Sequence, residues 1–435
     1  MRPLALIALA LCLAPALASP ADTLDAAMAE FWREAGDSDA ARQIDRVVRT
    51  GGSFDEVYAR LAAGRSYAAD VPKGELSWQS RIAGGAVLPT TVLVPPGYDP
   101  KTKYPVRFFL HGGIARVSIE APPAAPRRRR LEFSDGYIQV YPSGFIEAPW
   151  WSGTQLDNFD RLIARLKRTY NVDENRVHVM GFSDGGTGAF YAGLRHATAW
   201  SVLFPFHGSL RVLANPTVGV EGELFLTNLT NVPAYIVNGG RDPLYPVSAT
   251  EPFIALLERA GAPVRFRPQP DAGHDPSWWP GERGAVDEFE RSHARDPLPD
   301  RLSWQTERTD RDNRFRWLVI EKLDRSRSSS SMEHFNAIDW NGGKQEVFRH
   351  RRPAGRVDLV RDGNVAEVRT SGVGAFTLLL APSDFDFDRP VQVRVNGRPA
   401  FDGPIKKDVR TLLNWAARDH DRTMLFGAAL RVEVP

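Results

Sequence analysis

Short apolar runs alternate with stretches of helical periodicity between residues 88 and 274, and this alternation limits the folds open to the chain. Helical spacing of apolar residues is found at 159–170 and again at 253–257. Buried strands that alternate with helices predict βαβ units, and hence a mostly parallel sheet flanked by helices. The predicted strands are residues 106–110, 137–141, 177–180, 201–204, 235–237 and 264–266.

The region before this alternation is predicted to be helical over residues 19–74. Ser53 and Glu56 have the spacing of a capping box, the apolar residues that follow share one helix face, and Gly64 stands where that helix would end.

The region after the alternation has a β pattern. A Pro-rich linker at 296–299 is followed by short strand-like runs, with hairpin turn signals at Asp362-Gly363 and Asn396-Gly397. A helix is expected only at 408–418. We therefore predict a β-rich domain over residues 300–435, in the form of a small sandwich.

The first eighteen residues have the pattern of a secretory signal peptide. Arg2 precedes a short apolar run at 4–13, and Ala16-Leu17-Ala18 resembles a cleavage site. The run is too short for a membrane span. We expect an exported protein, periplasmic or extracellular. The single cysteine, Cys12, lies within this leader, which excludes zinc or iron–sulfur sites with cysteine ligands.

The charge balance argues against binding to nucleic acid. The chain has 55 Lys and Arg against 53 Asp and Glu, a net charge of +2. Proteins that bind nucleic acid usually carry a clear basic excess.

The sequence Gly181-Phe182-Ser183-Asp184-Gly185 directly follows a predicted strand and precedes a helix. This is the G-x-S-x-G nucleophile elbow in the strand–turn–helix setting that it requires. A serine at such a turn projects its hydroxyl above the sheet edge. Ser183 is therefore the candidate nucleophile.

Three further motifs follow other predicted strands. His111-Gly112-Gly113 comes after the strand at 106–110, and its glycines could present backbone N–H groups to an oxyanion. Gly113 and Asp184 are the predicted oxyanion donors, with Gly112 as the neighbouring candidate.

Asp242 and His274 complete the pattern, because each lies in a loop after a predicted strand. The chain order Ser183, Asp242, His274 is that of the α/β-hydrolase triad. His274 would act as general base and then as general acid, and Asp242 would orient its imidazole.

These motifs resemble those of the α/β-hydrolase superfamily, in the esterase branch that includes polyhydroxybutyrate depolymerases and feruloyl esterases. They are also similar to the catalytic domain of prolyl oligopeptidases. The resemblance rests further on Val94-Pro95-Pro96-Gly97-Tyr98 and on the loop at 240–246, and it implies an α/β-hydrolase catalytic domain at 75–295.

Aromatic residues follow several of the predicted strands, where ligands of open α/β sheets bind. They suggest an aromatic, sugar-linked or polymeric acyl substrate, although packing of loops would explain them as well. Arg241 could bind a substrate carboxylate or form a surface ion pair. The predicted substrate-binding residues are Trp150, Trp151, Phe206, Trp278, Trp279 and Arg241.

The histidines outside the triad, among them His178 and His207, lack the spacing of metal ligands. We expect no metal and no organic cofactor. The predicted function is a secreted serine hydrolase that cleaves small or polymeric carboxylic esters through an acyl-enzyme. A peptidase or amidase with the same triad, and an inert protein that binds glycans or a partner, are the alternatives. The oligomeric state is not predicted.

Overall fold

The fold is described from a computed structural model, for residues 23–34, 40–82, 85, 87–120, 136–328 and 332–435. The predicted signal peptide, residues 1–18, lies outside this part of the chain. Among the described residues, no helix combines the length and the apolar character that crossing a bilayer requires.

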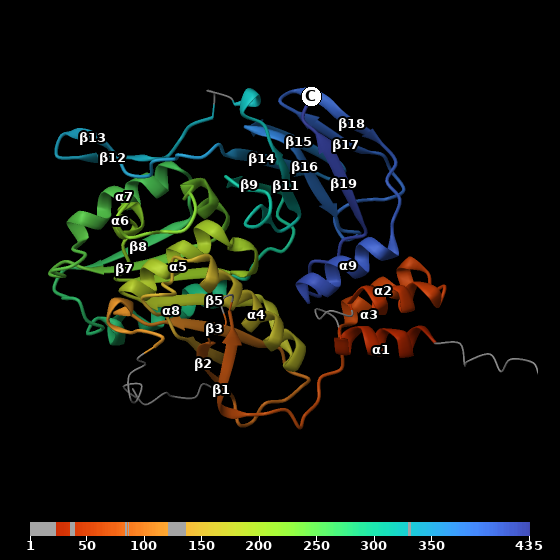
Figure 1. Cartoon of the computed structure of the whole chain (residues 1–435), viewed down its shortest axis with the longest axis horizontal. Coiled ribbons are helices and arrows are strands. Elements are labelled where there is room, and N and C mark those ends of the chain that lie inside the picture. Colours follow the sequence, from red (N-terminus) through yellow and green to blue (C-terminus); the bar gives the residue numbers. More distant parts are fainter. Residues whose placement is uncertain (1–22, 35–39, 83–84, 86, 121–135, 329–331) are drawn as a thin grey trace, which may run out of the picture.

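The α/β part of the molecule is built on an eight-stranded sheet in the order β1-β2-β4-β3-β5-β6-β7-β8 (Figure 1). Strands β1, β2 and β4 pair antiparallel, and the pairs from β4 and β3 through to β8 are all parallel. The predicted mostly parallel sheet is therefore confirmed. The strands are β1 (Gly74–Arg81), β2 (Val87–Val94), β3 (Tyr104–Leu110), β4 (Ile138–Pro142), β5 (Val172–Phe182), β6 (Val202–Phe206), β7 (Ala234–Gly239) and β8 (Val264–Gln269).

Helices cover both faces of this sheet. Successive residues of a strand point to opposite faces, so neighbouring buried residues pack against different helices. Leu203 of β6 belongs to the same buried cluster as residues of α4, α5 and α7, whereas its neighbour Phe204 packs with Val286 and Phe289 of α8. The helices and short turns of this part are η1 (Ile114–Arg116), α4 (Gly153–Thr169), α5 (Asp184–Arg195), η2 (Ala197–Ala199), α6 (Leu210–Ala214), η3 (Leu226–Asn231), α7 (Val247–Arg259) and α8 (Trp279–Ser292).

The C-terminal part is built from two main sheets, of five strands (β18-β17-β15-β14-β9) and four strands (β10-β11-β16-β19). Its β-rich character is as predicted, and buried residues of both sheets join one hydrophobic cluster. The elements are β9 (Arg301–Thr306), β10 (Arg314–Phe315), β11 (Leu318–Leu323), η4 (Arg325–Arg327), β12 (Ala337–Trp340), β13 (Gly343–Glu346), β14 (Gly355–Asp362), β15 (Val365–Ser371), β16 (Val373–Leu380), β17 (Val391–Val395), β18 (Arg398–Gly403), α9 (Val409–Asp419) and β19 (Ala428–Glu433).

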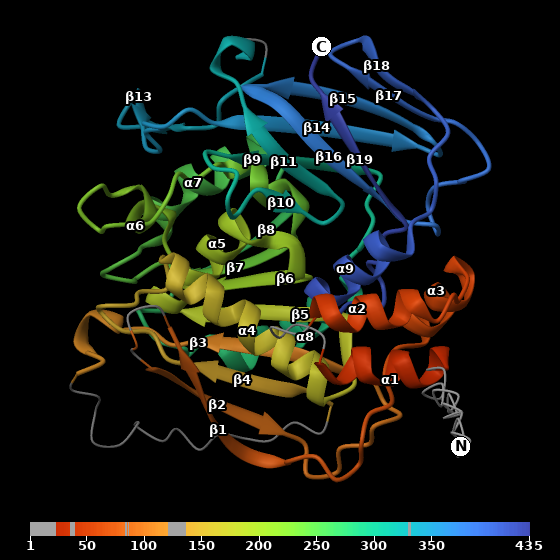
Figure 2. The same cartoon turned by 45° about the vertical axis from the view of Figure 1, so that its right-hand side comes forward.

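The three N-terminal helices lie against the C-terminal helix α9, as Figure 2 shows. They are α1 (Leu24–Glu34), α2 (Ala40–Arg49) and α3 (Phe54–Ala63), and the predicted capping box of Ser53 and Glu56 begins α3. Phe31, Val57 and Leu61 are buried in one cluster with Leu412 and Leu413 of α9. This part of the chain therefore buries its apolar faces against residues that are more than 300 positions away.

Buried ion pairs join the α/β part to the C-terminal part. Asp421 is fully buried, and its carboxylate lies 3.0 Å from Lys167 Nζ and 2.7 Å from Arg295 Nη2. Burial by itself would raise the pKa of Asp421, but the charges of Arg295 and Lys167 outweigh that effect and hold it well below its usual range. The carboxylate therefore stays charged and binds two cations of the α/β part.

We predict that Asp421→Asn lowers the free energy of unfolding by about 3–5 kcal/mol, because it leaves two buried cations without their counter-charge. Urea denaturation at pH 7 measures this. Asp45→Asn is the matched control: Asp45 forms an exposed pair with Arg410 at 2.6 Å, worth no more than about 1 kcal/mol. Because the folded-state pKa is depressed, the stabilisation is present above about pH 4 and is lost as the pH falls. Equal effects of the two substitutions would contradict the prediction.

Candidate active site

Ser183 lies at the sharp turn between β5 and α5, as its motif predicts. Its backbone has φ 59° and ψ −121°, a conformation that non-glycine residues rarely adopt. Helix α5 begins at the next residue, Asp184. Strain of this kind persists only where the surroundings impose it, and it is concentrated at functional sites.

The structure brings Ser183, His274 and Asp242 into one chain of hydrogen bonds. His274 Nε2 lies 2.8 Å from Ser183 Oγ, and His274 Nδ1 lies 2.7 Å from Asp242 Oδ2. The Asp242 side chain is fully buried, whereas that of His274 is 18% exposed. A hydroxyl, an imidazole and a carboxylate in this order can move a proton away from the hydroxyl.

The loop after β7 fixes the Asp242 carboxylate. Its Oδ1 accepts hydrogen bonds from the backbone N–H groups of Leu244, at 2.8 Å, and Tyr245, at 2.9 Å. Burial acts to raise the pKa of Asp242, but hydrogen bonds from Tyr245, His207, His274 and Leu244 outweigh it and lower the pKa. The group is therefore an anion at neutral pH.

A second imidazole reaches the same carboxylate, and the sequence reasoning missed it. His207 Nδ1 lies 2.7 Å from Asp242 Oδ2, the oxygen that also binds His274. His207 follows β6 in the sequence Phe206-His207-Gly208. Its place directly after a strand of the parallel sheet is the signal in the sequence that points to the site, whereas its spacing from other histidines carries no such information.

The predicted oxyanion turn lies beside Ser183. A Cβ atom on Gly112 would be 2.9 Å from Ser183 Cβ and 3.0 Å from the Phe182 carbonyl oxygen, so only glycine fits without displacement. Gly113 has φ +69°, in the left-handed region that favours glycine. The Asp184 side chain accepts a hydrogen bond at 3.0 Å from the N–H of Ile114, which ties this turn to the elbow.

His111 holds the same turn from the other side. Its Nε2 accepts a hydrogen bond from the Gly144 N–H at 3.0 Å, and its Nδ1 then donates to the Gly112 carbonyl oxygen at 2.9 Å. The carbonyl oxygen of His111 accepts from the Trp150 indole N–H at 2.8 Å. Trp150 is fully buried, so this placement gives it a packing contact behind the turn.

Trp151 lines a hollow of about 200 Å³ beside the elbow. Asp184 supplies the polar side of the hollow, and exposed Ile146 stands at its rim. The other lining residues are apolar: Ile114, Ala115, Pro149 and Val218.

The remaining predicted substrate-binding residues lie at or after the ends of β6, β7 and β8. Phe206, Trp278 and Trp279 form an aromatic cluster, with Phe206 at 5.1 Å from Trp278 and 5.9 Å from Trp279 between ring centroids. Phe206 and Trp278 are buried. Arg241 is exposed and pairs with Asp271 at 2.7 Å, which is the surface ion pair weighed above.

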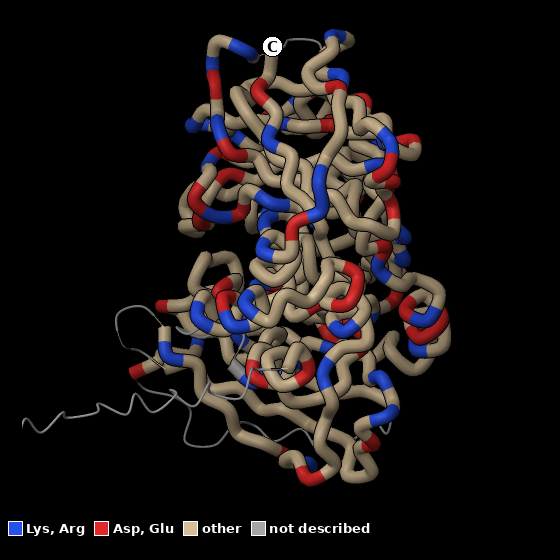
Figure 3. Tube along the Cα trace, turned by 90° about the vertical axis from the view of Figure 1, so that its right-hand side faces the viewer, with Lys and Arg blue, Asp and Glu red and all other residues tan. Residues whose placement is uncertain are grey.

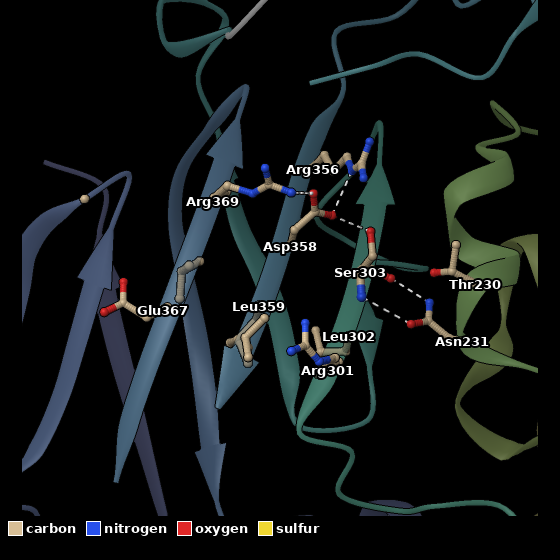
Figure 4. Close-up of a pocket in the computed structure, with 13 residues that line it drawn as sticks. Thr230, Asn231, Arg301, Leu302, Ser303, Arg356, Asp358, Leu359, Glu367 and Arg369 are labelled. Atoms are coloured by element: carbon tan, nitrogen blue, oxygen red, sulfur yellow. Dashed lines mark hydrogen bonds and ion pairs between the residues drawn. The ribbon is translucent and has the colours of Figure 1, made fainter. Parts of the chain in front are cut away.

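A second hollow, of about 580 Å³, lies over β9, β14 and β15 (Figure 4), and none of the elbow residues lines it. In it Arg356 and Arg369 both point to Asp358, at 2.8 Å and 3.5 Å. Ser303 also donates to Asp358, at 2.6 Å. Arg356, Asp358 and Arg369 are thus paired with one another, and Glu367 pairs with Arg394, which is not among the lining residues.

One group of described side chains has ligand atoms close enough together to consider a metal site. It consists of His207, Asp242 and His274. Each ring nitrogen lies 2.7 Å from the shared carboxylate oxygen. Ligands about 2.0–2.1 Å from a tetrahedral zinc ion lie about 3.3 Å apart. The shorter separation fits N–H···O hydrogen bonds.

Lys and Arg are interspersed with Asp and Glu along the trace (Figure 3).

Comparison with known families shows that residues 148–276 match the dienelactone hydrolase family. The matched segment contains Ser183, Asp242 and His274. Together with the mixed eight-stranded sheet and its flanking helices, the match identifies an α/β-hydrolase fold and confirms the predicted resemblance to that superfamily. The match also supports a hydrolase activity.

Two similar proteins of known name are larger than this chain. Dipeptidyl-peptidase 5 of Porphyromonas gingivalis is 22% identical over 241 residues, which are 46% of this chain and 34% of that protein. The bifunctional acetylxylan esterase/xylanase XynS20E of Neocallimastix patriciarum is 32% identical over 81 residues, 18% of this chain and 12% of that protein. The chain thus spans about a third of the first relative and less of the second.

Solved structures with a similar arrangement include a thermostable esterase, with a TM-score of 0.39 and 21% identity over 51% of this chain and 63% of that one. A ferulic acid esterase has a TM-score of 0.38 and 18% identity over 50% of this chain and 97% of that one.

We predict that Gly185→Ala prevents the elbow from packing on β3. The added Cβ would lie 1.9 Å from the backbone oxygen of Leu110, which cannot rotate away, so the free energy of unfolding should fall by about 3 kcal/mol. Thermal and urea denaturation measure this. At Gly97 a Cβ would meet nothing within 4 Å, so Gly97→Ala is the matched control. A Gly185→Ala protein as stable as the control would show that the elbow is less tightly packed than described.

Proposed function

We propose that the chain is a serine hydrolase that cleaves carboxylic esters through an acyl-enzyme, with Ser183, His274 and Asp242 as the catalytic residues. The observation that carries this proposal is the hydrogen-bond chain from Ser183 Oγ through His274 to Asp242, at 2.8 Å and 2.7 Å, on a strained strand-to-helix turn. The match to a hydrolase family over the same residues supports it.

In the proposed first step, Ser183 Oγ attacks the ester carbonyl carbon and its proton moves to His274 Nε2. The C–O bond to the leaving alcohol then breaks, and the alkoxide takes the proton back from His274 as it departs. The acyl group is left on Ser183. A water molecule then attacks the acyl carbon and gives a proton to His274 Nε2. The bond from that carbon to Ser183 Oγ breaks, Oγ takes the proton from His274, and the carboxylic acid is released.

Backbone N–H groups next to the nucleophile would stabilise the tetrahedral oxyanion. Those of Asp184, at the N-terminus of α5, and Gly113, at the start of η1, are the proposed donors, with Gly112 beside them. The bond from Ile114 N–H to the Asp184 carboxylate supports this role, because it holds the two segments at a fixed separation. Preorganised donors of this kind are worth about 3–4 kcal/mol each.

The hollow next to Asp184 is the proposed place for the apolar end of the ester. Its volume of about 200 Å³ is below the ~300 Å³ of the smallest common ligand pockets. It therefore suits a short acyl or alkyl group, while the rest of a larger ester would extend past the exposed side chains of Ile146 and Leu244.

Cleavage of peptides or other amides is the second candidate, because the same catalytic group can cleave them and one similar protein is a dipeptidyl-peptidase. Ester substrates remain the preferred proposal because no cationic side chain for a peptide carboxylate stands among the lining residues, and the one carboxylate there, Asp184, already accepts a hydrogen bond from the Ile114 N–H. We also propose that residues 1–18 direct the export of the protein, and that the catalytic domain spans residues 75–295.

We predict that Ser183→Ala lowers kcat/KM for p-nitrophenyl acetate by at least about 10⁴-fold, because it removes the hydroxyl that lies against His274 Nε2 and would receive the acyl chain. Circular dichroism should be unchanged, since alanine retains the Cβ atom at this turn. Ser292→Ala, at the exposed end of α8, is the matched control and should retain full activity. Turnover of a dipeptide p-nitroanilide faster than the ester would favour the amidase alternative, and full activity of Ser183→Ala would exclude Ser183 as nucleophile.

We predict that Ala115→Phe fills the hollow and raises KM for p-nitrophenyl butyrate about tenfold more than KM for the acetate, because loss of space for two methylene groups costs at least this factor. Steady-state kinetics on both esters measure the change. Arg116→Phe adds the same ring at the next exposed position, outside the hollow, and should leave the ratio of the two KM values unchanged. An unchanged ratio in Ala115→Phe would place the acyl group elsewhere.

A further inference from the structure

His207 is held at the centre of the site by contacts from three directions. It is fully buried, and its backbone N–H donates to the Val237 carbonyl oxygen at 2.7 Å. Its ring is stacked on Trp278, with centroids 6.0 Å apart at an interplanar angle of 21°, and it lies 5.0 Å from the ring of Phe182. Its backbone has φ 48°, a left-handed conformation in which histidine and asparagine are enriched.

The protonation state of His207 follows from its two ring nitrogens. Nδ1 lies 2.7 Å from Asp242 Oδ2, and a carboxylate can only accept, so Nδ1 carries a proton and donates. Nε2 is buried without a hydrogen-bond partner in the described part of the chain. A second proton on Nε2 would be a buried donor with no acceptor, which is costly. His207 is therefore neutral.

Electrostatics agree with this assignment. Burial lowers the pKa of His207, against the opposing hydrogen bond and negative charge of Asp242. The titratable groups that face His207 are Asp242, His274 and Asp275, whereas its ring neighbours Phe182 and Trp278 carry no charge. His274 is thus the imidazole free to gain a proton during the reaction.

We propose that His207 is a positioning residue that fixes the Asp242 carboxylate and sets the basicity of His274. This inference rests on the proposed function. The Nδ1–H groups of His207 and His274 both donate to Asp242 Oδ2. Part of the negative charge of this oxygen is therefore already bound by His207 and interacts less with His274.

Two consequences follow for the reaction. With Oδ1 bound to two backbone N–H groups and Oδ2 bound to two imidazoles, the carboxylate cannot rotate, and His274 keeps the orientation that directs Nε2 to Ser183. The shared hydrogen bond also leaves less of the Asp242 negative charge to attract a proton on His274, because the same oxygen accepts from both imidazoles.

The test uses His207→Phe, which keeps a ring against Trp278 and removes the donor, and His207→Asn, whose side-chain N–H₂ can replace Nδ1 and whose backbone tolerates positive φ. In His207→Phe we expect kcat for p-nitrophenyl acetate to fall about tenfold with KM within about twofold. The acidic limb of kcat/KM should move to higher pH, because the negative charge of Asp242 is then shared with one imidazole instead of two. His207→Asn should restore the wild-type limb.

Nuclear magnetic resonance of the full chain gives a readout that does not depend on activity. With ¹⁵N-labelled histidine, the wild type should show two Nδ1–H protons with the signature of a hydrogen bond to a carboxylate, assigned to His207 and His274, and His207→Phe should lose one. The proposal is overturned by one such signal in the wild type, or by a folded His207→Phe protein with unchanged kcat and pH profile. If the wild type neither turns over the ester nor labels with a fluorophosphonate, the proposed function fails instead, while the two signals still report the shared hydrogen bond.

Discussion

The close approach of backbone to backbone at the elbow is the constraint on which the site depends. A Cβ on Gly185 would collide with the end of β3, and one on Gly186 would lie 2.6 Å from the carbonyl oxygen of Phe206 at the end of β6. Because two glycines let α5 begin this close to its neighbours, three strand ends converge within hydrogen-bond reach of one another. Ser183, the oxyanion turn and the loop that begins with His207 are neighbours for this reason.

This convergence also explains how much the sequence could predict. Parallel strands end at one edge of the sheet, so motifs that follow such strands meet there whatever the loops between them do. The six predicted strands all form, and Ser183, Asp242 and His274 meet although 91 residues separate the first from the last. The capping box of α3 was predictable because its contacts span only three residues.

Features that depend on distant partners were not predictable in the same way. Trp150 lies in a loop and could face substrate or protein, and only the position of the His111 carbonyl oxygen decides that its indole turns inward. His207 carries no motif of its own, because its role comes from a carboxylate 35 residues later. The packing of α1–α3 on α9 joins the two ends of the described chain, and the sequence pattern of either segment does not predict the other as its packing partner.

The buried cations of the α/β part have a consequence for the order in which the protein can reach its native state. Lys167 and Arg295 are neutralised by a residue 254 and 126 positions further along the chain, respectively. Arg195, the last residue of α5, is neutralised by Glu307 and Asp312. During synthesis the α/β segment emerges with these charges uncompensated, so its last folding step waits for the β-rich region. We therefore expect the α/β part to reach its full stability only once the chain through Asp421 has been made.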